Sequence, residues 1–116
     1  MKEIIMDTSF ILTCIKQKID FFEELIGFKI IIPLEVIKEI EGLSISNSSA
    51  QIALALLNKA NYQKISLGKG IVDELLINFA KKNPLIIIAT LDKEIKKSVK
   101  NEKMVIRGRK KLEVIW

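Results

Sequence analysis

The sequence contains no histidine, one cysteine and two prolines among its 116 residues. The lack of histidine excludes Ser-His-Asp and Cys-His catalysis, and it also excludes imidazole ligands for zinc. The single cysteine, Cys14, cannot form an internal disulfide, and its place in an apolar helical pattern indicates a buried core residue. Any chemistry must therefore come from carboxylates, hydroxyls or lysines.

Long apolar runs are missing as well, because no run approaches the length that spans a bilayer. Glu3 and Asp7 interrupt the N-terminal region where a signal peptide would carry its apolar stretch. With 49% hydrophobic and 28% charged residues, the composition is that of a globular chain. We therefore expect a single domain over residues 1–116, without membrane association and in a reducing cytoplasm.

The net charge of +5 is unevenly distributed along the chain. Residues 1–80 carry 8 Lys/Arg and 10 Asp/Glu, whereas residues 81–116 carry 11 and 4. Such asymmetry is typical of proteins that bind a polyanion such as RNA, although a solvated lysine-rich surface is an equally good explanation.

An unbroken apolar run from Leu85 to Ala89 is the feature around which the other predictions are organised. It is too short for a helix, and it predicts a strand buried on both faces of a parallel sheet. The run stops at Thr90, and Asp92 precedes a helical pattern over 93–100. Asp92 is thus expected at the carboxyl end of a strand, where α/β sheets bind ligands.

Strands and helices are predicted to alternate through most of the chain. The pattern indicates an α/β fold, a three-layer α/β/α sandwich with a central, mostly parallel sheet. Strands are expected at 3–6, 29–32, 63–67, 104–106 and 112–115, and helices at 10–25 (one bent or two), 34–43, 50–60 (capped by Ser48 or Ser49) and 71–82.

Four acids are placed where apolar elements meet the expected ligand edge. Asp7 ends the first strand, Asp92 follows the strand at 85–89, Asp73 lies in the first turn of a helix, and Glu39 lies between Ile37 and Ile40. Each has an ordinary explanation as well. Asp7 and Asp92 suit helix N-caps worth about 1 kcal/mol, Asp73 suits the positive end of a helix dipole, and Glu39 suits a solvated helix margin.

Taken together, the four acids favour a functional explanation. Two carboxylates about 4 Å apart repel by roughly 4 kcal/mol at an effective dielectric constant near 20. A fold gains nothing from gathering four of them unless a cation is held among them. Oxygen-only ligands suit Mg²⁺ or Mn²⁺, ions that serve phosphoryl chemistry.

Four segments of the sequence resemble the motifs of the PIN domain family. They are Met-Asp-Thr-Ser at 6–9, Ile-Pro-Leu-Glu-Val-Ile-Lys-Glu-Ile at 32–40, Val-Asp-Glu-Leu-Leu at 72–76 and Ile-Ala-Thr-Leu-Asp-Lys-Glu-Ile at 88–95. They occur in the family's order and extend over nearly the whole chain. The resemblance implies a Mg²⁺- or Mn²⁺-dependent endoribonuclease that hydrolyses single-stranded RNA.

The resemblance also assigns roles to residues. It implies that Asp7, Glu39, Asp73 and Asp92 form the catalytic, metal-binding acidic cluster, with Ser9 and Thr90 as supporting hydroxyls. Glu74 adjoins Asp73 and Glu94 lies near Asp92, so each neighbour is an alternative ligand. Basic residues of the C-terminal third are expected to hold RNA, namely Lys93, Arg107, Arg109, Lys110 and Lys111.

Alternatives to the nuclease interpretation remain within the same fold. One is a catalytically weak RNA- or protein-binding subunit, since an intact acidic set does not by itself require turnover. Another is the toxin of a toxin–antitoxin pair, as in VapC-like members, with an antitoxin as partner. The basic strand pair is more similar to archaeal and ribosome-processing members of the family, and the resemblance also implies a homodimer.

Overall fold

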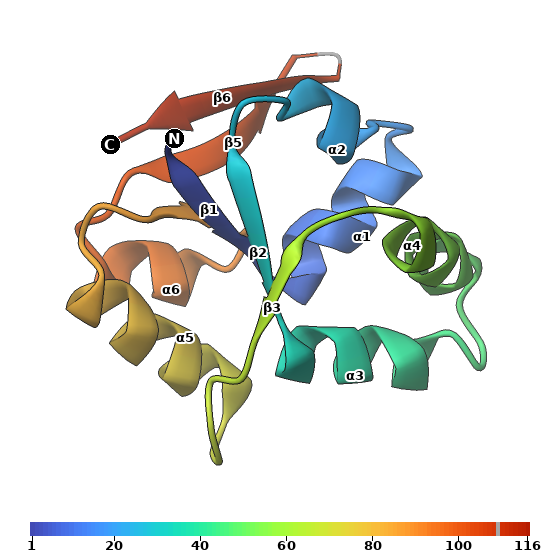
Figure 1. The fold of residues 1–116 in the computed structure, drawn as a ribbon, viewed down its shortest axis with the longest axis horizontal. Coiled ribbons are helices and arrows are strands. Elements are labelled where there is room, and N and C mark those ends of the chain that lie inside the picture. Colours follow the sequence, from blue (N-terminus) through green and yellow to red (C-terminus); the bar gives the residue numbers. More distant parts are fainter. Residues whose placement is uncertain (109) are drawn as a thin grey trace.

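The computed structural model describes residues 1–108 and 110–116 (Figure 1). The described strands are β1 (Glu3–Met6), β2 (Lys29–Pro33), β3 (Gln63–Ile65), β4 (Ile87–Ala89), β5 (Lys103–Arg107) and β6 (Lys111–Ile115). The described helices are α1 (Thr8–Lys16), α2 (Phe21–Glu24), α3 (Leu34–Leu43), α4 (Ser48–Lys59), α5 (Val72–Lys82) and α6 (Lys93–Ser98).

The strands form one sheet in the order β3-β2-β1-β4-β5-β6. Neighbouring strands are parallel except for β5 and β6, which form an antiparallel hairpin. The predicted α/β class and mostly parallel sheet are confirmed. From β1 the chain first builds outward through β2 and β3, and it then returns to add β4, β5 and β6 on the other side. The boundary between β1 and β4 is therefore the switch point of the sheet, where α/β proteins bind ligands.

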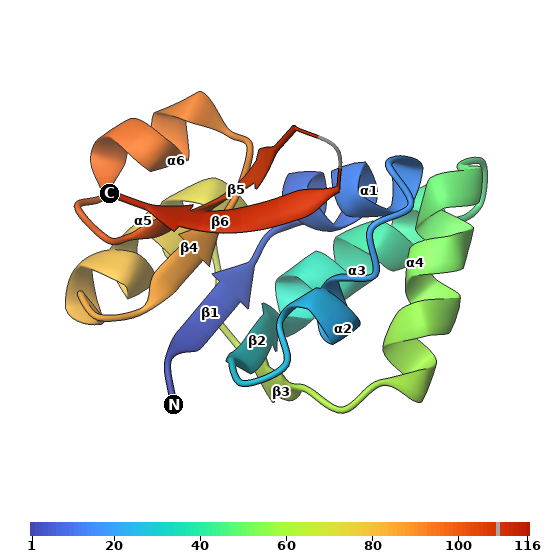
Figure 2. The ribbon, with the colours of Figure 1, turned by 90° about the horizontal axis from the view of Figure 1, so that it is seen from above.

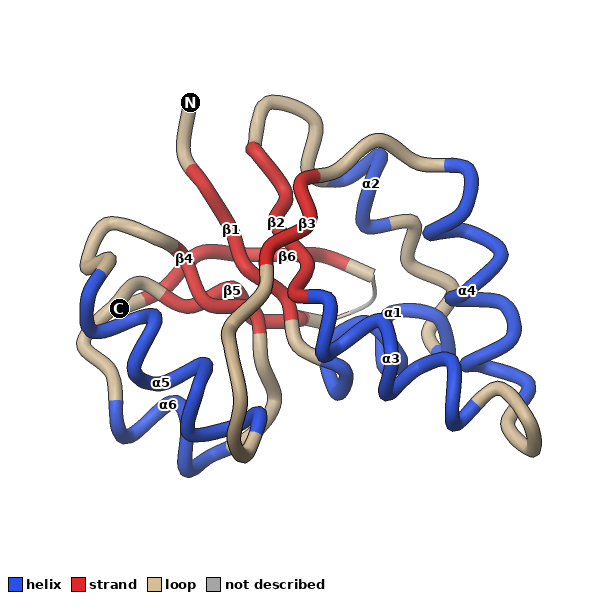
Figure 3. The backbone as a smooth tube through the Cα atoms, turned by 60° about the horizontal axis from the view of Figure 1, so that its bottom comes forward, coloured by secondary structure: helices blue, strands red, loops and turns tan. Residues whose placement is uncertain are grey.

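Helices cover both faces of the sheet, as Figures 2 and 3 show, with α1, α3 and α4 on one side and α5 and α6 on the other. In β1, Ile4 and Met6 join the apolar cluster under the first helix layer, while Ile5 joins the cluster under the second. All three side chains are 0% exposed. Burial on both faces explains why the strands are unbroken apolar runs rather than alternating ones.

Strand β4 is shorter than the apolar run from Leu85 to Ala89. Leu85 was expected within it, but its side chain is 89% exposed and lies before the strand begins. Asn83 and Pro84 end α5, and the N–H of Ile86 bonds back to the carbonyl oxygen of Asn83 at 3.1 Å. This turn places Leu85 outside the sheet before Ile87 enters it.

The predicted helix over 10–25 is two helices, separated by a turn. The N–H groups of Lys18 and Ile19 bond back to the carbonyls of Ile15 and Cys14, and Lys18 adopts a φ of 59°. A left-handed residue after a helix is a common way to end it. Ile26 continues the helical apolar spacing of the sequence, four positions after Phe22, but it is 78% exposed.

The start of α4 also differs from expectation. The cap was predicted at Ser48 or Ser49, but the Asn47 side chain accepts the Ala50 N–H at 3.0 Å, and the helix begins at Ser48. Asparagine, like serine, is a favoured N-cap residue, so the sequence alone could not decide between them.

None of the helices within residues 1–108 and 110–116 combines the length and the apolar character needed to cross a membrane.

Asn101 holds the end of α5 against the entrance to β4. Its side chain is 3% exposed, and its amide nitrogen lies 3.1, 2.9 and 3.0 Å from the carbonyl oxygens of Ala80, Asn83 and Ile86. These three carbonyls belong to the last turn of α5 and to the turn after it, which sets where β4 begins. Their shared donor is therefore important for the start of β4.

We predict that Asn101→Ala lowers the free energy of unfolding by about 2 kcal/mol, because buried carbonyls lose their donor. Asn101→Asp is expected to cost more, since it places carboxylate oxygens against the same carbonyls. Denaturant unfolding measures both changes, and the exposed Asn61→Ala serves as the matched control. Equal stability of the Asn101→Ala and Asn61→Ala proteins would contradict this role.

Candidate active site

Asp7 is the most buried of the predicted acids, with 7% of its surface exposed. It follows β1 and is the N-cap of α1, where Oδ1 accepts the Phe10 N–H at 3.0 Å. The Ser9 hydroxyl donates to the same oxygen at 2.9 Å, and the Thr90 hydroxyl donates to Oδ2. Three donors therefore compensate the carboxylate for its removal from water.

Ser9 and Thr90 connect the two strands at the switch point. Ser9 Oγ accepts the Leu91 N–H at 3.2 Å, and Thr90 Oγ1 accepts the Asp92 N–H at 3.0 Å. Each hydroxyl thus donates to Asp7 and accepts from the segment that follows β4. The chain that leads to Asp92 is thereby tied to the chain that carries Asp7.

Asp92 is the N-cap of α6. Its Oδ1 accepts the N–H groups of Glu94 and Ile95 at 2.8 and 3.2 Å. Asp73 lies in the first turn of α5, on the opposite side of the sheet from α3, which carries Glu39. Asp73 and Glu39 are both exposed.

The structure brings the four acids to one cavity of about 230 Å³ at the carboxyl edge of the sheet. Neither Glu74 nor Glu94, the alternatives in sequence, is among the described residues that line it. The lining residues are Asp7, Thr8, Ser9, Glu39, Val72, Asp73 and Asp92.

Burial and the proximity of the acids shift the pKa values of Asp7 and Asp73. Desolvation raises the pKa of the Asp73 carboxyl above its usual range, and the charges of Asp92 and Glu39 raise it further, as does a hydrogen bond with Asp92. Burial raises the pKa of Asp7, the charge of Asp73 adds to this, and the three hydrogen bonds to Asp7 oppose it. The cavity therefore favours either a proton or a cation among these groups.

Thr8 is a cavity residue that the sequence analysis did not single out. Its Oγ1 is buried and, among the described residues, lacks a hydrogen-bond partner. Unpaired buried hydroxyls are uncommon in folded proteins. Its position between Asp7 and Ser9 was the available signal, because the first turn of a helix that follows a strand-end acid faces the same edge.

The donor set suits a hard divalent cation in its chemistry, since it consists of carboxylate and hydroxyl oxygens without histidine or cysteine. The described side chains are, however, not spaced for metal binding. Within residues 1–108 and 110–116, no group of three or more His, Cys, Asp or Glu side chains is arranged so that it could hold a metal ion. The acids share a cavity, and a cation would have to draw their side chains closer together.

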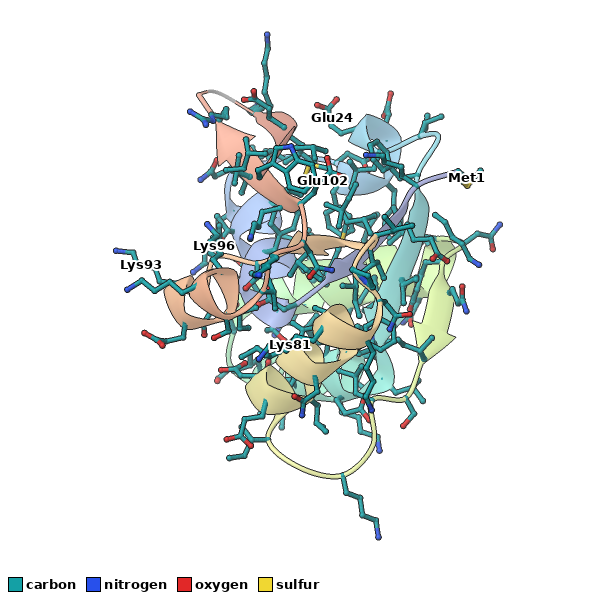
Figure 4. All side chains as sticks on the ribbon, turned by 90° about the vertical axis from the view of Figure 1, so that its left-hand side faces the viewer. Met1, Glu24, Lys81, Lys93, Lys96 and Glu102 are labelled. Atoms are coloured by element: carbon teal, nitrogen blue, oxygen red, sulfur yellow. The ribbon has the colours of Figure 1, made fainter. Side chains whose placement is uncertain are left out.

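None of the described basic residues predicted to hold RNA lines the acidic cavity. Lys93 begins α6 beside Asp92 and, like Lys96, extends from that helix toward solvent (Figure 4). Arg107 Nε pairs with Glu113 across the hairpin at 3.2 Å. Lys110 lines a different hollow with Asp20 and Glu23, Lys111 begins β6, and Arg109 lies outside the described residues.

Comparisons with known proteins agree with the fold. A family model described as a PIN like domain matches residues 4–111. Ribonuclease VapC4 of Methanocaldococcus jannaschii is 32% identical over 127 aligned positions, which cover 98% of this chain and 97% of the relative. A structure titled "Structure of the PIN domain endonuclease Utp24" matches with a TM-score of 0.82 at 24% identity, covering 97% of this chain and 90% of that one. At this identity, the structural match shows the fold alone.

We predict that Asp7→Asn raises the melting temperature in metal-free buffer at neutral pH. Asparagine can still cap α1, and it removes a buried charge whose pKa is raised by burial. A carboxyl with a raised pKa destabilises the folded state above that pKa, so the advantage of Asp7→Asn should shrink as the pH falls through it. Thermal melts from neutral to acidic pH measure this.

Asp7→Ala is the comparison variant, because it also removes the charge but loses the cap, at a cost of about 1 kcal/mol. A lower melting temperature for Asp7→Asn than for the parent at neutral pH would show that the ionised Asp7 carboxylate does not destabilise the folded state.

Proposed function

Since the chain belongs to the PIN-like domain family, we propose that it is a divalent-metal-dependent endoribonuclease that hydrolyses phosphodiester bonds of single-stranded RNA. The observation that carries this proposal is the cavity at the sheet's switch point. Four acids that are up to 85 positions apart in sequence line it, and two of them have raised pKa values. The name of the sequence relative from Methanocaldococcus jannaschii supports RNA as the substrate.

The proposed ligands are Asp7, Asp73 and Asp92, with Glu39 at the margin of the same cavity. Mg²⁺ or Mn²⁺ fits this set because both prefer oxygen donors. When bound, such an ion supplies Lewis-acid activation of the phosphate and of the attacking water.

The chain's own groups position these ligands. Ser9 and Thr90 orient the Asp7 carboxylate through their hydroxyl groups, and the cap contacts of Asp92 Oδ1 fix that side chain at the start of α6. The Thr8 hydroxyl, buried and unpaired among the described residues, is available to donate to a phosphate oxygen. These groups are in place before substrate arrives, which lowers the cost of organising the site.

RNA binding is assigned to the basic residues of the C-terminal third. Lys93 is the nearest in sequence to a cavity acid, and its exposed side chain is free to follow a phosphate backbone. We propose that Arg107, Lys110 and Lys111 extend this contact along the β5–β6 hairpin, and that Arg109, which lies outside the described residues, also binds RNA. Binding through phosphates would weaken as the salt concentration rises.

The experiment is cleavage of an unstructured RNA oligonucleotide with Mn²⁺ or Mg²⁺ and with chelator. We predict that Asp73→Asn and Asp92→Asn each reduce cleavage by about 100-fold or more, because each removes an anionic ligand from the metal. Glu74→Gln and Glu94→Gln are matched controls. Each removes the charge of a glutamate that lies near a proposed ligand in sequence but does not line the cavity. These controls should retain activity within about twofold.

Equal cleavage by the parent and by Asp73→Asn would remove the proposed site. Equal losses in the Asp73→Asn and Glu74→Gln proteins would reassign the effect to general surface charge rather than to the cavity.

A second function is favoured by one observation, the lack of a ready metal-binding group among the described side chains. With the same fold, the protein would act as an RNA- or protein-binding subunit with little activity. RNA binding that is independent of metal, together with no cleavage under either ion, would support this alternative over the nuclease.

The proposed chemistry is compatible with two biological roles, a toxin and an RNA-processing enzyme. A toxin role would pair this chain with an antitoxin, whereas a processing role would pair it with ribosome-assembly partners, and the family resemblance adds a homodimer. An adjacent small antitoxin gene with growth arrest on expression would support the toxin setting. Size-exclusion chromatography at several concentrations tests the dimer.

We also propose that residues 1–116 form a single domain, because both apolar clusters pack against the same strands. One cooperative unfolding transition, coincident by far-ultraviolet circular dichroism and by calorimetry, is the expected result. Two separate transitions would show that the two helix layers unfold independently.

A further inference from the structure

The loop between β3 and α5, residues 66–71, carries the chain into the helix that holds Asp73. Two of its glycines adopt backbone conformations that other residues rarely adopt, with φ of 105° at Gly68 and 139° at Gly70. Most of the loop is exposed, including Ile71 at 65%. Such a segment does not hold a defined position by packing alone.

Glu35, in the first turn of α3, binds this loop from 31 and 32 residues away in sequence. Its Oε1 accepts the Leu67 N–H at 3.0 Å, and its Oε2 accepts the Ser66 hydroxyl at 3.2 Å. Burial raises the pKa of the Glu35 carboxyl, but its hydrogen bonds, including one with the Gly68 backbone, lower it more, and the net result is a pKa below the usual range. The contacts therefore favour the charged carboxylate.

The start of α5 needs such an external contact for two reasons. Its N-cap residue, Ile71, makes no side-chain capping bond, so the helix lacks a local anchor. Asp73 also lines the same cavity as Asp92 and Glu39, and the negative charges of these three carboxylates repel one another. Both effects would let the first turn of α5 move away from the cavity if the loop were released.

Helix α3 is well placed to supply the contact. Glu35 and Glu39 are four residues apart and lie on one face of the helix. The same helix is fixed to the core by Val36 and Ile40, both 0% exposed. A single rigid element thus presents Glu39 to the cavity and contacts the loop that leads to Asp73.

We propose that Glu35 is a positioning residue that holds the β3–α5 loop, and with it Asp73, at the acidic cavity, from where Asp73 can join Asp92 and Glu39 around a divalent cation. This inference rests on the proposed function for the role of Asp73 as a ligand. Glu35 itself contacts neither metal nor substrate, since it is not among the described residues that line the acidic cavity.

The test compares Glu35→Ala, Ser66→Ala and the double variant with the parent. We expect Glu35→Ala to raise the Mn²⁺ concentration for half-maximal cleavage by about tenfold or more, the usual effect of removing a partner that supports a metal ligand. The maximal rate at saturating Mn²⁺ should stay within about twofold, because all ligands are still present. Ser66→Ala should give a smaller shift, and adding it to Glu35→Ala should give no further effect.

Glu41→Ala is the matched control, since it removes the same charge from an exposed position on the same helix. It should leave the Mn²⁺ requirement unchanged. Glu35→Gln keeps one acceptor oxygen for the Leu67 N–H, so it should recover part of the lost affinity. A purely structural role would lower the maximal rate and the melting temperature without this recovery.

Two readouts do not depend on cleavage, namely Mn²⁺ binding by calorimetry and amide hydrogen exchange at residues 66–73. Faster exchange confined to this segment in Glu35→Ala, but not in Glu41→Ala, is expected. If the parent cleaves no RNA, the nuclease proposal fails while these two measurements still decide the role of Glu35. Unchanged exchange and unchanged Mn²⁺ affinity in Glu35→Ala would overturn the inference, whether or not the parent is active.

Discussion

Repulsion among the carboxylates of Asp7, Glu39, Asp73 and Asp92 is the constraint to which the carboxyl edge of the sheet responds. These groups line one cavity, and the charges of Asp92 and Glu39 raise the pKa of Asp73. Each acid is restrained in a different way. Asp7 is surrounded by three donors, Asp92 is bound to two backbone N–H groups, and Glu39 is carried by a helix fixed in the core. Asp73 lies in the first turn of a helix without a side-chain cap, so its position depends on the loop that precedes the helix.

Structural and functional explanations of these acids are compatible. Asp7 and Asp92 are helix N-caps, as ordinary sequence statistics favour, and they also line the cavity. A cap places a carboxylate at the positive end of a helix, where its charge is stabilised. The cap contacts therefore lower the cost of keeping two of the four charges at one edge, and the hydroxyls of Ser9 and Thr90 join the capped segments across the switch point.

Several local predictions failed for reasons that lie outside local sequence. Leu85 belongs to an apolar run, yet it is exposed because Asn101 gathers the carbonyls of the preceding turn and delays the strand. Ile26 fits a helical stripe, yet the helix has already ended. Asn47 rather than a serine caps α4. In each case a long-range contact or a competing local bond decided between alternatives of similar intrinsic preference.

The amino-acid sequence by itself determined the alternation of strands and helices, burial on both sheet faces and the four candidate acids. These follow from periodicity, from unbroken isoleucine runs and from strand-end carboxylates, all of which are local properties. Only the tertiary structure decided that Asp73 and Asp92, rather than Glu74 and Glu94, line the cavity, that Thr8 joins them, and that Glu35 holds a loop more than thirty residues away. Adjacent residues differ in direction by about 100° around a helix, so the choice between neighbours depends on how each helix is rotated against the sheet, and packing sets that rotation.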